Sequence, residues 1–92
     1  MAVTYLMLAR VPEGGLGDFE GYERVVLPLL AEYGGRLERR LRSVDDRVEA
    51  HLVTFPDGKD LDAFRADARR VAAAPLLESS GAAVELLAVR DV

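Results

Sequence analysis

The order of strand-like and helix-like segments constrains the fold of this chain most. Two long segments have apolar residues at spacings of three and four, which is typical of amphipathic helices. Each lies between short apolar runs of strand length, at residues 2–10, 36–44, 48–55 and 82–90. Two strand–helix–strand crossovers joined by a hairpin place both helices on one face of a four-stranded antiparallel sheet. We therefore predict an α+β, ferredoxin-like βαββαβ fold.

The length of the chain predicts one domain over residues 1–92. A chain this short buries only about 60–65% of its unfolded surface, so its core is modest. Cysteine is absent, and stability must therefore come from packing or assembly rather than from disulfides.

The first helix is expected over residues 18–33, with Asp18 as its N-cap. Pro28 lies inside the pattern and should bend the helix, because proline removes one backbone hydrogen bond. Gly34 and Gly35 should end it. One face carries an apolar stripe made of Phe19, Tyr22, Val26, Leu29, Leu30 and Tyr33.

The second helical segment follows Pro56, with Asp57 as the expected N-cap. Its buried stripe is predicted to contain Leu61, Phe64, Ala68, Val71 and Ala72. We expect a break at Ala74-Pro75 and a short further helix that begins at Pro75, since proline suits the first turn of a helix. Gly81 should end that helix.

The hairpin fixes which side chains share a face. If Asp45 and Asp46 form the turn, the residue numbers of paired positions sum to 91. This register predicts four pairs on one surface: Arg42 with Glu49, Arg40 with His51, Glu38 with Val53, and Arg36 with Phe55. The opposite surface, which contains Leu37, Leu41 and Leu52, is the better candidate for the helix layer. The first surface would then be the open face.

An open sheet face with apolar groups such as Val53 and Phe55 is unusual for a monomer. Burial against a second copy is the simplest solution, and two-fold dimers are the commonest assemblies. We therefore predict a homodimer whose open faces stack.

Several spaced residues resemble a large, uncharacterised family of small bacterial proteins in the dimeric α/β-barrel superfamily. They are Phe19-x-x-Tyr22, Pro28, Tyr33-Gly34-Gly35-Arg36, Arg40, and Phe55-Pro56-Asp57 followed by Leu61 and Phe64. The resemblance covers roughly residues 2–66 and implies the ferredoxin-like fold and dimerisation. The chain departs from the family at Asp67-Ala68-Arg69-Arg70, where the family carries a Ser-Pro-Glu-Tyr-like segment.

His51 is the only histidine, and beside Arg40 it is a candidate general acid or base. Arg42 is a candidate for binding an anionic group by two parallel hydrogen bonds. The structural alternatives are a histidine packed in the dimer interface and cross-strand ion pairs. Further candidate ligand-binding residues are Glu38, Glu49, Phe55 and Tyr5.

Several functional classes are not favoured by the sequence. The net charge of −4 argues against broad nucleic-acid binding, and no metal-ligand spacing or cofactor motif is present. The longest apolar run is far shorter than the roughly 20 residues that a membrane span needs. We expect a cytoplasmic protein without metal, cofactor, nucleic-acid partner or membrane.

Three functions stay open. The first is a module that binds a small, perhaps anionic, metabolite or serves assembly alone. The second is a cofactor-independent isomerase, cyclase or monooxygenase-like enzyme that uses His51 and Arg40. The resemblance lowers the oxygenase version, because superfamily monooxygenases use Asn and Trp side chains, which this chain lacks. The third is an effector-sensing regulatory domain. A cavity of a few hundred Å³ would favour ligand binding.

Overall fold

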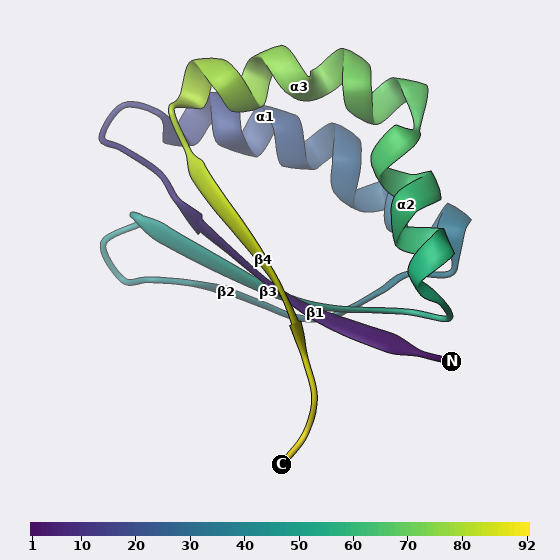
Figure 1. Cartoon of the computed structure of the whole chain (residues 1–92). Coiled ribbons are helices and arrows are strands. Elements are labelled where there is room, and N and C mark those ends of the chain that lie inside the picture. The colour runs from purple at the N-terminus through teal and green to yellow at the C-terminus, as the bar shows by residue number, and fades with distance from the viewer.

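Four antiparallel strands form one sheet, and all helices lie on one face of it (Figure 1). The structure is a computed structural model that describes residues 1–92. The strand order is β2-β3-β1-β4, which confirms the predicted ferredoxin-like fold. The strands are β1 (Val3–Arg10), β2 (Arg36–Arg42), β3 (Val48–Phe55) and β4 (Ala83–Val89). The helices are α1 (Leu16–Val26), the 3₁₀-helix η1 (Leu27–Tyr33), α2 (Gly58–Ala66) and α3 (Ala68–Ser80).

The first helical segment begins earlier than predicted and changes type along its length. Gly15, not Asp18, is the N-cap of α1. At Leu27 the α-helix gives way to η1, and Pro28 lies in the first turn of η1. The disturbance expected at Pro28 therefore takes the form of tighter 3₁₀ winding. Gly34 ends η1 in the left-handed conformation, with φ of 71°, as predicted.

The second helical segment breaks at a different residue from the predicted one. Asp57 caps α2 as expected, since its side chain accepts a hydrogen bond from the Lys59 N–H at 3.2 Å. The break comes at Asp67, whose side chain accepts from the Arg69 N–H at 2.8 Å and so caps α3. The helix then continues through Pro75, which lies on its exposed side. The predicted break at Ala74-Pro75 was wrong.

The hairpin register is confirmed near the turn and shifted farther along. Arg42 pairs with Glu49 and Arg40 pairs with His51. A bulge between Leu37 and Arg39 inserts Glu38 as an extra residue. Val53 and Thr54 consequently lie opposite Leu37 and Arg36, so the predicted pairs of Glu38 with Val53 and of Arg36 with Phe55 were wrong.

The two faces of the sheet are reversed relative to the prediction. Glu49, His51, Val53 and Phe55 point toward the helices and are buried. Phe55 belongs to the main core, where its ring centroid lies 5.8 Å from that of Phe64. The polar members of this face are tolerated beneath the helices because they have charged and hydrogen-bonding partners there. The open face instead carries leucine-rich positions, namely Leu6, Leu8, Leu41, Leu52, Leu87 and Val89.

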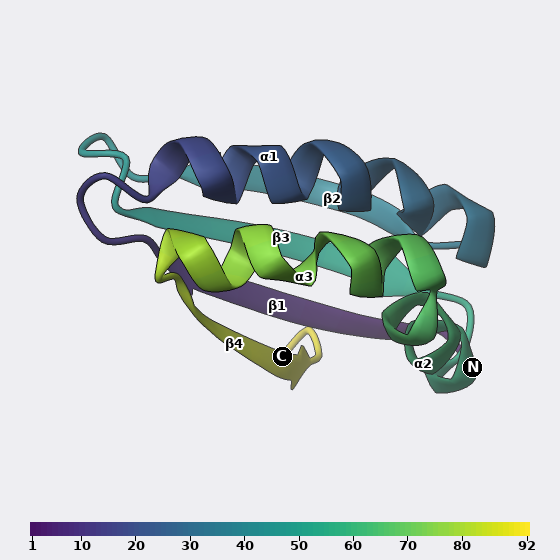
Figure 2. The ribbon, with the colours of Figure 1, turned by 90° about the horizontal axis from the view of Figure 1, so that it is seen from above.

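The helix layer leaves one edge of the sheet uncovered. Figure 2 shows α1 and α3 side by side above the sheet, with β4 lying beyond them. Every residue of β4 is exposed. Space between the helices and the sheet is therefore accessible from the β4 edge. No helix in the structure is both long enough and apolar enough to cross a membrane.

Candidate active site

His51 lies between two carboxylates beneath α1. Its Nε2 atom lies 2.5 Å from Glu49 Oε2 and 3.0 Å from Glu23 Oε2. Glu49 precedes it by two residues on β3 and so points to the same face, whereas Glu23 comes from the buried side of α1. All three residues are at most 4% exposed. A carboxylate that holds one imidazole nitrogen fixes the orientation and tautomer of the ring.

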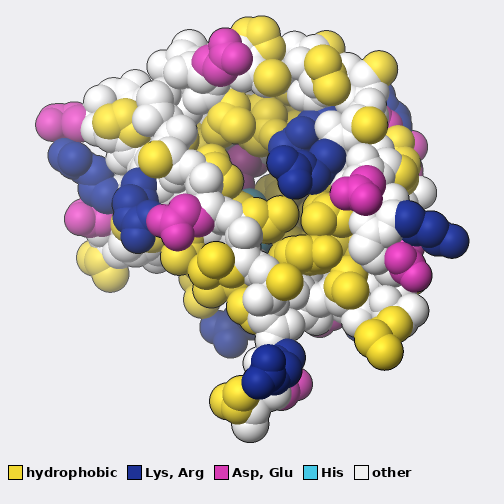
Figure 3. Space-filling model, viewed as in Figure 1, with side chains coloured by type: hydrophobic (Ala, Val, Ile, Leu, Met, Phe, Trp, Pro, Cys, Tyr) yellow, Lys and Arg dark blue, Asp and Glu magenta, His cyan; other side chains and the backbone are white.

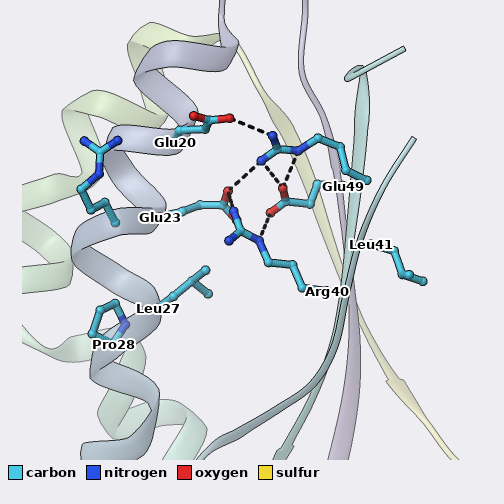
Figure 4. A pocket seen from close by; sticks show the side chains of 9 residues that line it. Glu20, Glu23, Leu27, Pro28, Arg40, Leu41 and Glu49 are labelled. Carbon is cyan, nitrogen blue, oxygen red and sulfur yellow. Dashed lines mark hydrogen bonds and ion pairs between the residues drawn. The ribbon is translucent and has the colours of Figure 1, made fainter. Parts of the chain in front are cut away.

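Two arginines of β2 neutralise these carboxylates from the solvent side (Figure 4). Arg42 donates from Nη2 to Glu49 Oε1 at 2.6 Å and from Nη1 to Glu20 Oε1 at 2.8 Å. Arg40 donates from Nη2 to Glu23 Oε1 at 3.0 Å. The two guanidinium groups thus face three carboxyl groups, those of Glu20, Glu23 and Glu49. If all three were ionised, one negative charge would have no partner, and a proton on one carboxyl group neutralises it.

Glu23 is the member of the cluster that favours that proton. Its Oε2 is buried and has no hydrogen-bond partner, although it lies 3.0 Å from His51 Nε2, which is closer to Glu49 Oε2. Burial raises the pKa of Glu23. The pKa of Glu49 is lowered, because hydrogen bonds with Glu23, Arg42 and His51 outweigh the effect of its burial. We therefore assign the proton-holding role to Glu23 and the ionised role to Glu49.

Two spaces adjoin this cluster. A polar groove of about 660 Å³ lies on the solvent side; it is lined by Glu20, Glu23, Arg24, Leu27, Pro28, Arg40, Leu41, Arg42 and Glu49. A cavity of about 520 Å³ lies between the sheet and the helices, and 14 of its 18 lining residues are hydrophobic. Figure 3, seen from the same side as Figure 1, shows a hollow between the helices and the sheet. It is bordered mostly by hydrophobic side chains, with basic side chain atoms at its rim. Glu23 lines both spaces, so it connects the cavity to the solvent side.

The structure separates the site residues proposed from the sequence. His51, Tyr5 and Phe55 line the cavity. Arg40, Arg42 and Glu49 line the groove instead, so His51 and Arg40, although paired across the hairpin, line different spaces. Glu38 lies outside both spaces, at the bulge, where it forms an ion pair with Arg36 at 3.1 Å.

Sequence reasoning missed four residues of the cavity wall that carry polar groups, namely Tyr22, Glu23, Arg65 and Arg70. One signal was present for Glu23. It lies within the apolar stripe of α1, next to Tyr22 and three residues before Val26. An acid in such a position is buried, and a buried acid needs a partner. No comparable signal marked Arg70, which stands among other charged residues.

Glu23, Glu49 and His51 could also hold a divalent cation, since their ligand atoms all lie within 4.8 Å of one another. The sequence showed no such set because Glu23 lies on a different element from the other two. In the structure both oxygens of Glu49 already accept hydrogen bonds from Arg42 and His51. Hydrogen bonds and one proton therefore explain why these three side chains lie so close together, and the cluster does not require a cation.

Comparison with solved structures identifies the fold. SnoaB, a cofactor-independent oxygenase from Streptomyces nogalater, is 20% identical with a TM-score of 0.75, over 99% of this chain and 95% of that one. A candidate antibiotic biosynthesis monooxygenase from Nitrosomonas europaea is 14% identical with a TM-score of 0.81, over 99% and 90%. Rv0793 from Mycobacterium tuberculosis is 17% identical with a TM-score of 0.75, over 100% and 98%. No family model and no curated protein matches the chain. At these identities the likeness establishes the ferredoxin-like fold that the sequence resemblance implied.

Proposed function

We propose that this protein binds a small, largely apolar organic molecule in the cavity and transfers a proton on it through His51, without a cofactor. The observation that carries the proposal is a histidine in the wall of an apolar cavity whose Nε2 is hydrogen-bonded to buried Glu49 and lies 3.0 Å from buried Glu23. A volume of about 520 Å³ lies within the range of small-molecule sites, roughly 300–1,000 Å³.

In this proposal the two nitrogens of His51 have different roles. Nε2 faces the carboxylates, which leaves Nδ1 for a molecule in the cavity. A proton that leaves an acidic C–H of the bound molecule moves to Nδ1, and its electron pair stays on the molecule as an enolate. The imidazolium that forms is stabilised by ionised Glu49. Return of the proton to another atom of the enolate completes an isomerisation. In a cyclisation the enolate carbon instead attacks a carbonyl carbon of the same molecule, the carbonyl π electrons move to its oxygen, and that oxygen takes the proton back from Nδ1.

The structural likeness to SnoaB supports cofactor-free chemistry in this fold. The lack of Asn and Trp in the chain favours proton transfer by His51 over an oxygenase mechanism that relies on those side chains. Arg40, proposed from the sequence as a partner of His51, acts in this scheme by orienting Glu23 from the groove.

Deuterium exchange into 2-tetralone, a bicyclic ketone with acidic C–H bonds, tests the proposal. We expect the wild-type protein to accelerate exchange in D₂O, as followed by proton NMR. His51→Gln should reduce the acceleration by about 100-fold, because general base catalysis typically contributes 10²–10⁴-fold. Val84→Trp, at an exposed position of the cavity wall, should block entry and abolish it.

Each alternative has its own outcome in this experiment. Saturable binding of 2-tetralone without exchange would show that the protein binds the molecule but does not transfer a proton, and it would overturn the proposed reaction. Equal exchange in wild type and His51→Gln would overturn the role of His51. Absence of both binding and exchange would overturn the use of the cavity.

We also propose that a second copy of the chain covers the open face. This face has two polar pairs: Arg10 and Glu85 form an ion pair at 2.6 Å, and Thr4 and Thr54, near the other end of β1, form a hydrogen bond at 3.2 Å. Between them lie the leucine-rich positions described above. Two such faces fit the apolar centre and polar rim that protein interfaces have.

A further inference from the structure

The cavity proposed to bind the substrate has its charged groups at different places in its wall. Glu23 and His51 come from α1 and β3. Arg65 and Arg70 come from the last turn of α2 and the first turn of α3. The remaining lining residues are largely hydrophobic. A bound molecule thus meets positive charge at the α2–α3 corner and an acid–base pair elsewhere.

Arg70 is better placed than Arg65 to bind an anion, because one nitrogen of its guanidinium is fixed by a hydrogen bond while another has no partner. Its Nη1 donates to the Arg65 carbonyl oxygen at 3.1 Å, and its charge lies 5.6 Å from the centre of the Phe64 ring. Its Nε is buried and has no hydrogen-bond partner. An unpartnered buried donor costs free energy that a ligand can recover.

The free Nε lies on the edge of the guanidinium that also carries Nη2. That edge presents two parallel N–H groups, a geometry that matches the two oxygens of a carboxylate. Tyr22 lines the same cavity, and the nearby Arg70 guanidinium partly offsets the rise that burial causes in the pKa of its hydroxyl. A neutral phenol and a guanidinium therefore face the same part of the cavity.

We propose that Arg70 is the carboxylate anchor of this cavity, so that the natural ligand is an amphipathic monoanion with an apolar ring body and a carboxylate. The carboxylate binds at the α2–α3 corner, and the ring body fills the apolar part of the cavity toward His51. The inference rests on the proposed use of the cavity and adds the class of ligand that it takes.

Two matched probes test the anchor: 2-naphthoate, and its uncharged isostere 2-naphthamide. Fluorescence titration of the wild-type protein should show about tenfold tighter binding of 2-naphthoate, as one charge-assisted hydrogen-bond pair provides. Arg70→Met should remove this preference and leave 2-naphthamide binding unchanged. Arg70→Lys should restore only part of it, because an ammonium lacks the two-pronged edge. Arg24→Met, which removes the same charge from the groove, should change neither affinity.

The outcomes separate this inference from the proposed function. Equal affinities for the two probes in wild type, or an unchanged preference in Arg70→Met, would overturn the anchor while the cavity still binds. Binding that Val84→Trp does not weaken would place the probes outside the cavity and overturn both proposals. Failure of both probes to bind would also overturn both proposals.

Discussion

Glu23 is the residue through which pH should act on stability. Because burial raises its pKa in the folded protein, the folded state holds the proton more tightly than the unfolded state. This contribution to stability is complete below the unfolded pKa, near 4.3, and is lost as pH rises through the folded pKa. Glu23→Gln mimics the protonated form at every pH. As pH rises from about 4 to 8, the wild-type protein should therefore lose stability relative to this variant. Urea denaturation across this range measures the difference, at about 1.4 kcal/mol for each unit of pKa elevation.

Glu78→Gln is the matched control, since it removes an acid from an exposed position of α3, outside the cluster. Its difference from wild type should stay nearly constant over the same range. Glu49 acts in the opposite direction, because its lowered pKa stabilises the fold at neutral pH and this stabilisation disappears in acid. A Glu23→Gln difference that does not grow with pH would contradict the assignment of the proton to Glu23.

Part of the candidate site, namely His51 and its place opposite Arg40, could be predicted from the sequence. His51 stood out as the only residue whose ordinary pKa lies near neutrality, and the hairpin register correctly placed it opposite Arg40. Glu23 and Arg70 were missed because their roles depend on which face of the sheet the helices cover. A register predicts neighbours along the sheet and gives no information on the layer above it.

At the scale of elements, the η1–β2 turn should depend on Gly34. Its φ of 71° is unfavourable for residues with a side chain, and an added Cβ would lie 2.9 Å from Pro56 Cγ. We expect Gly34→Ala to lower the free energy of unfolding by about 1–3 kcal/mol. Gly17→Ala in α1, where an added Cβ meets nothing within 4 Å, should instead raise it by about 0.5–1 kcal/mol. Urea midpoints of the two variants provide the measurement, and equal effects would show that the left-handed turn is not required.

The elements themselves followed from the sequence far better than their faces did. Strand β3 matches its predicted range because turn residues and Pro56 bound it on both sides. The prediction of which sheet face the helices cover was wrong, because both surfaces of the hairpin mix apolar and charged residues. Alternation alone therefore cannot choose between them. The break at Asp67 was missed because a capping side chain can interrupt a helix as effectively as proline, and Pro75 drew the prediction instead.

At the scale of the whole molecule, the uncovered sheet face sets the expected assembly. Four strands of seven or eight residues span about 19 Å by 25 Å, from strand spacings of about 4.8 Å and rises of about 3.3 Å per residue. Two stacked faces would bury about 1,000 Å² in total, near the lower limit for a specific interface. Because the helices lie on the other side, this face is the one large apolar surface left for a second copy.

Charge placed on this face should therefore dissociate the proposed dimer. Sedimentation equilibrium of the wild-type protein should give twice the chain mass of 10.1 kDa at micromolar concentrations. Leu87→Lys places a charge on the open face at a position that is 45% exposed, and it should shift the mass toward that of a single chain because the buried ammonium has no partner. Val25→Lys changes a residue of similar exposure, 42%, on α1 and should leave the dimer intact. A wild-type protein that sediments as a single chain, or equal dissociation by both variants, would show that this face does not hold a second copy.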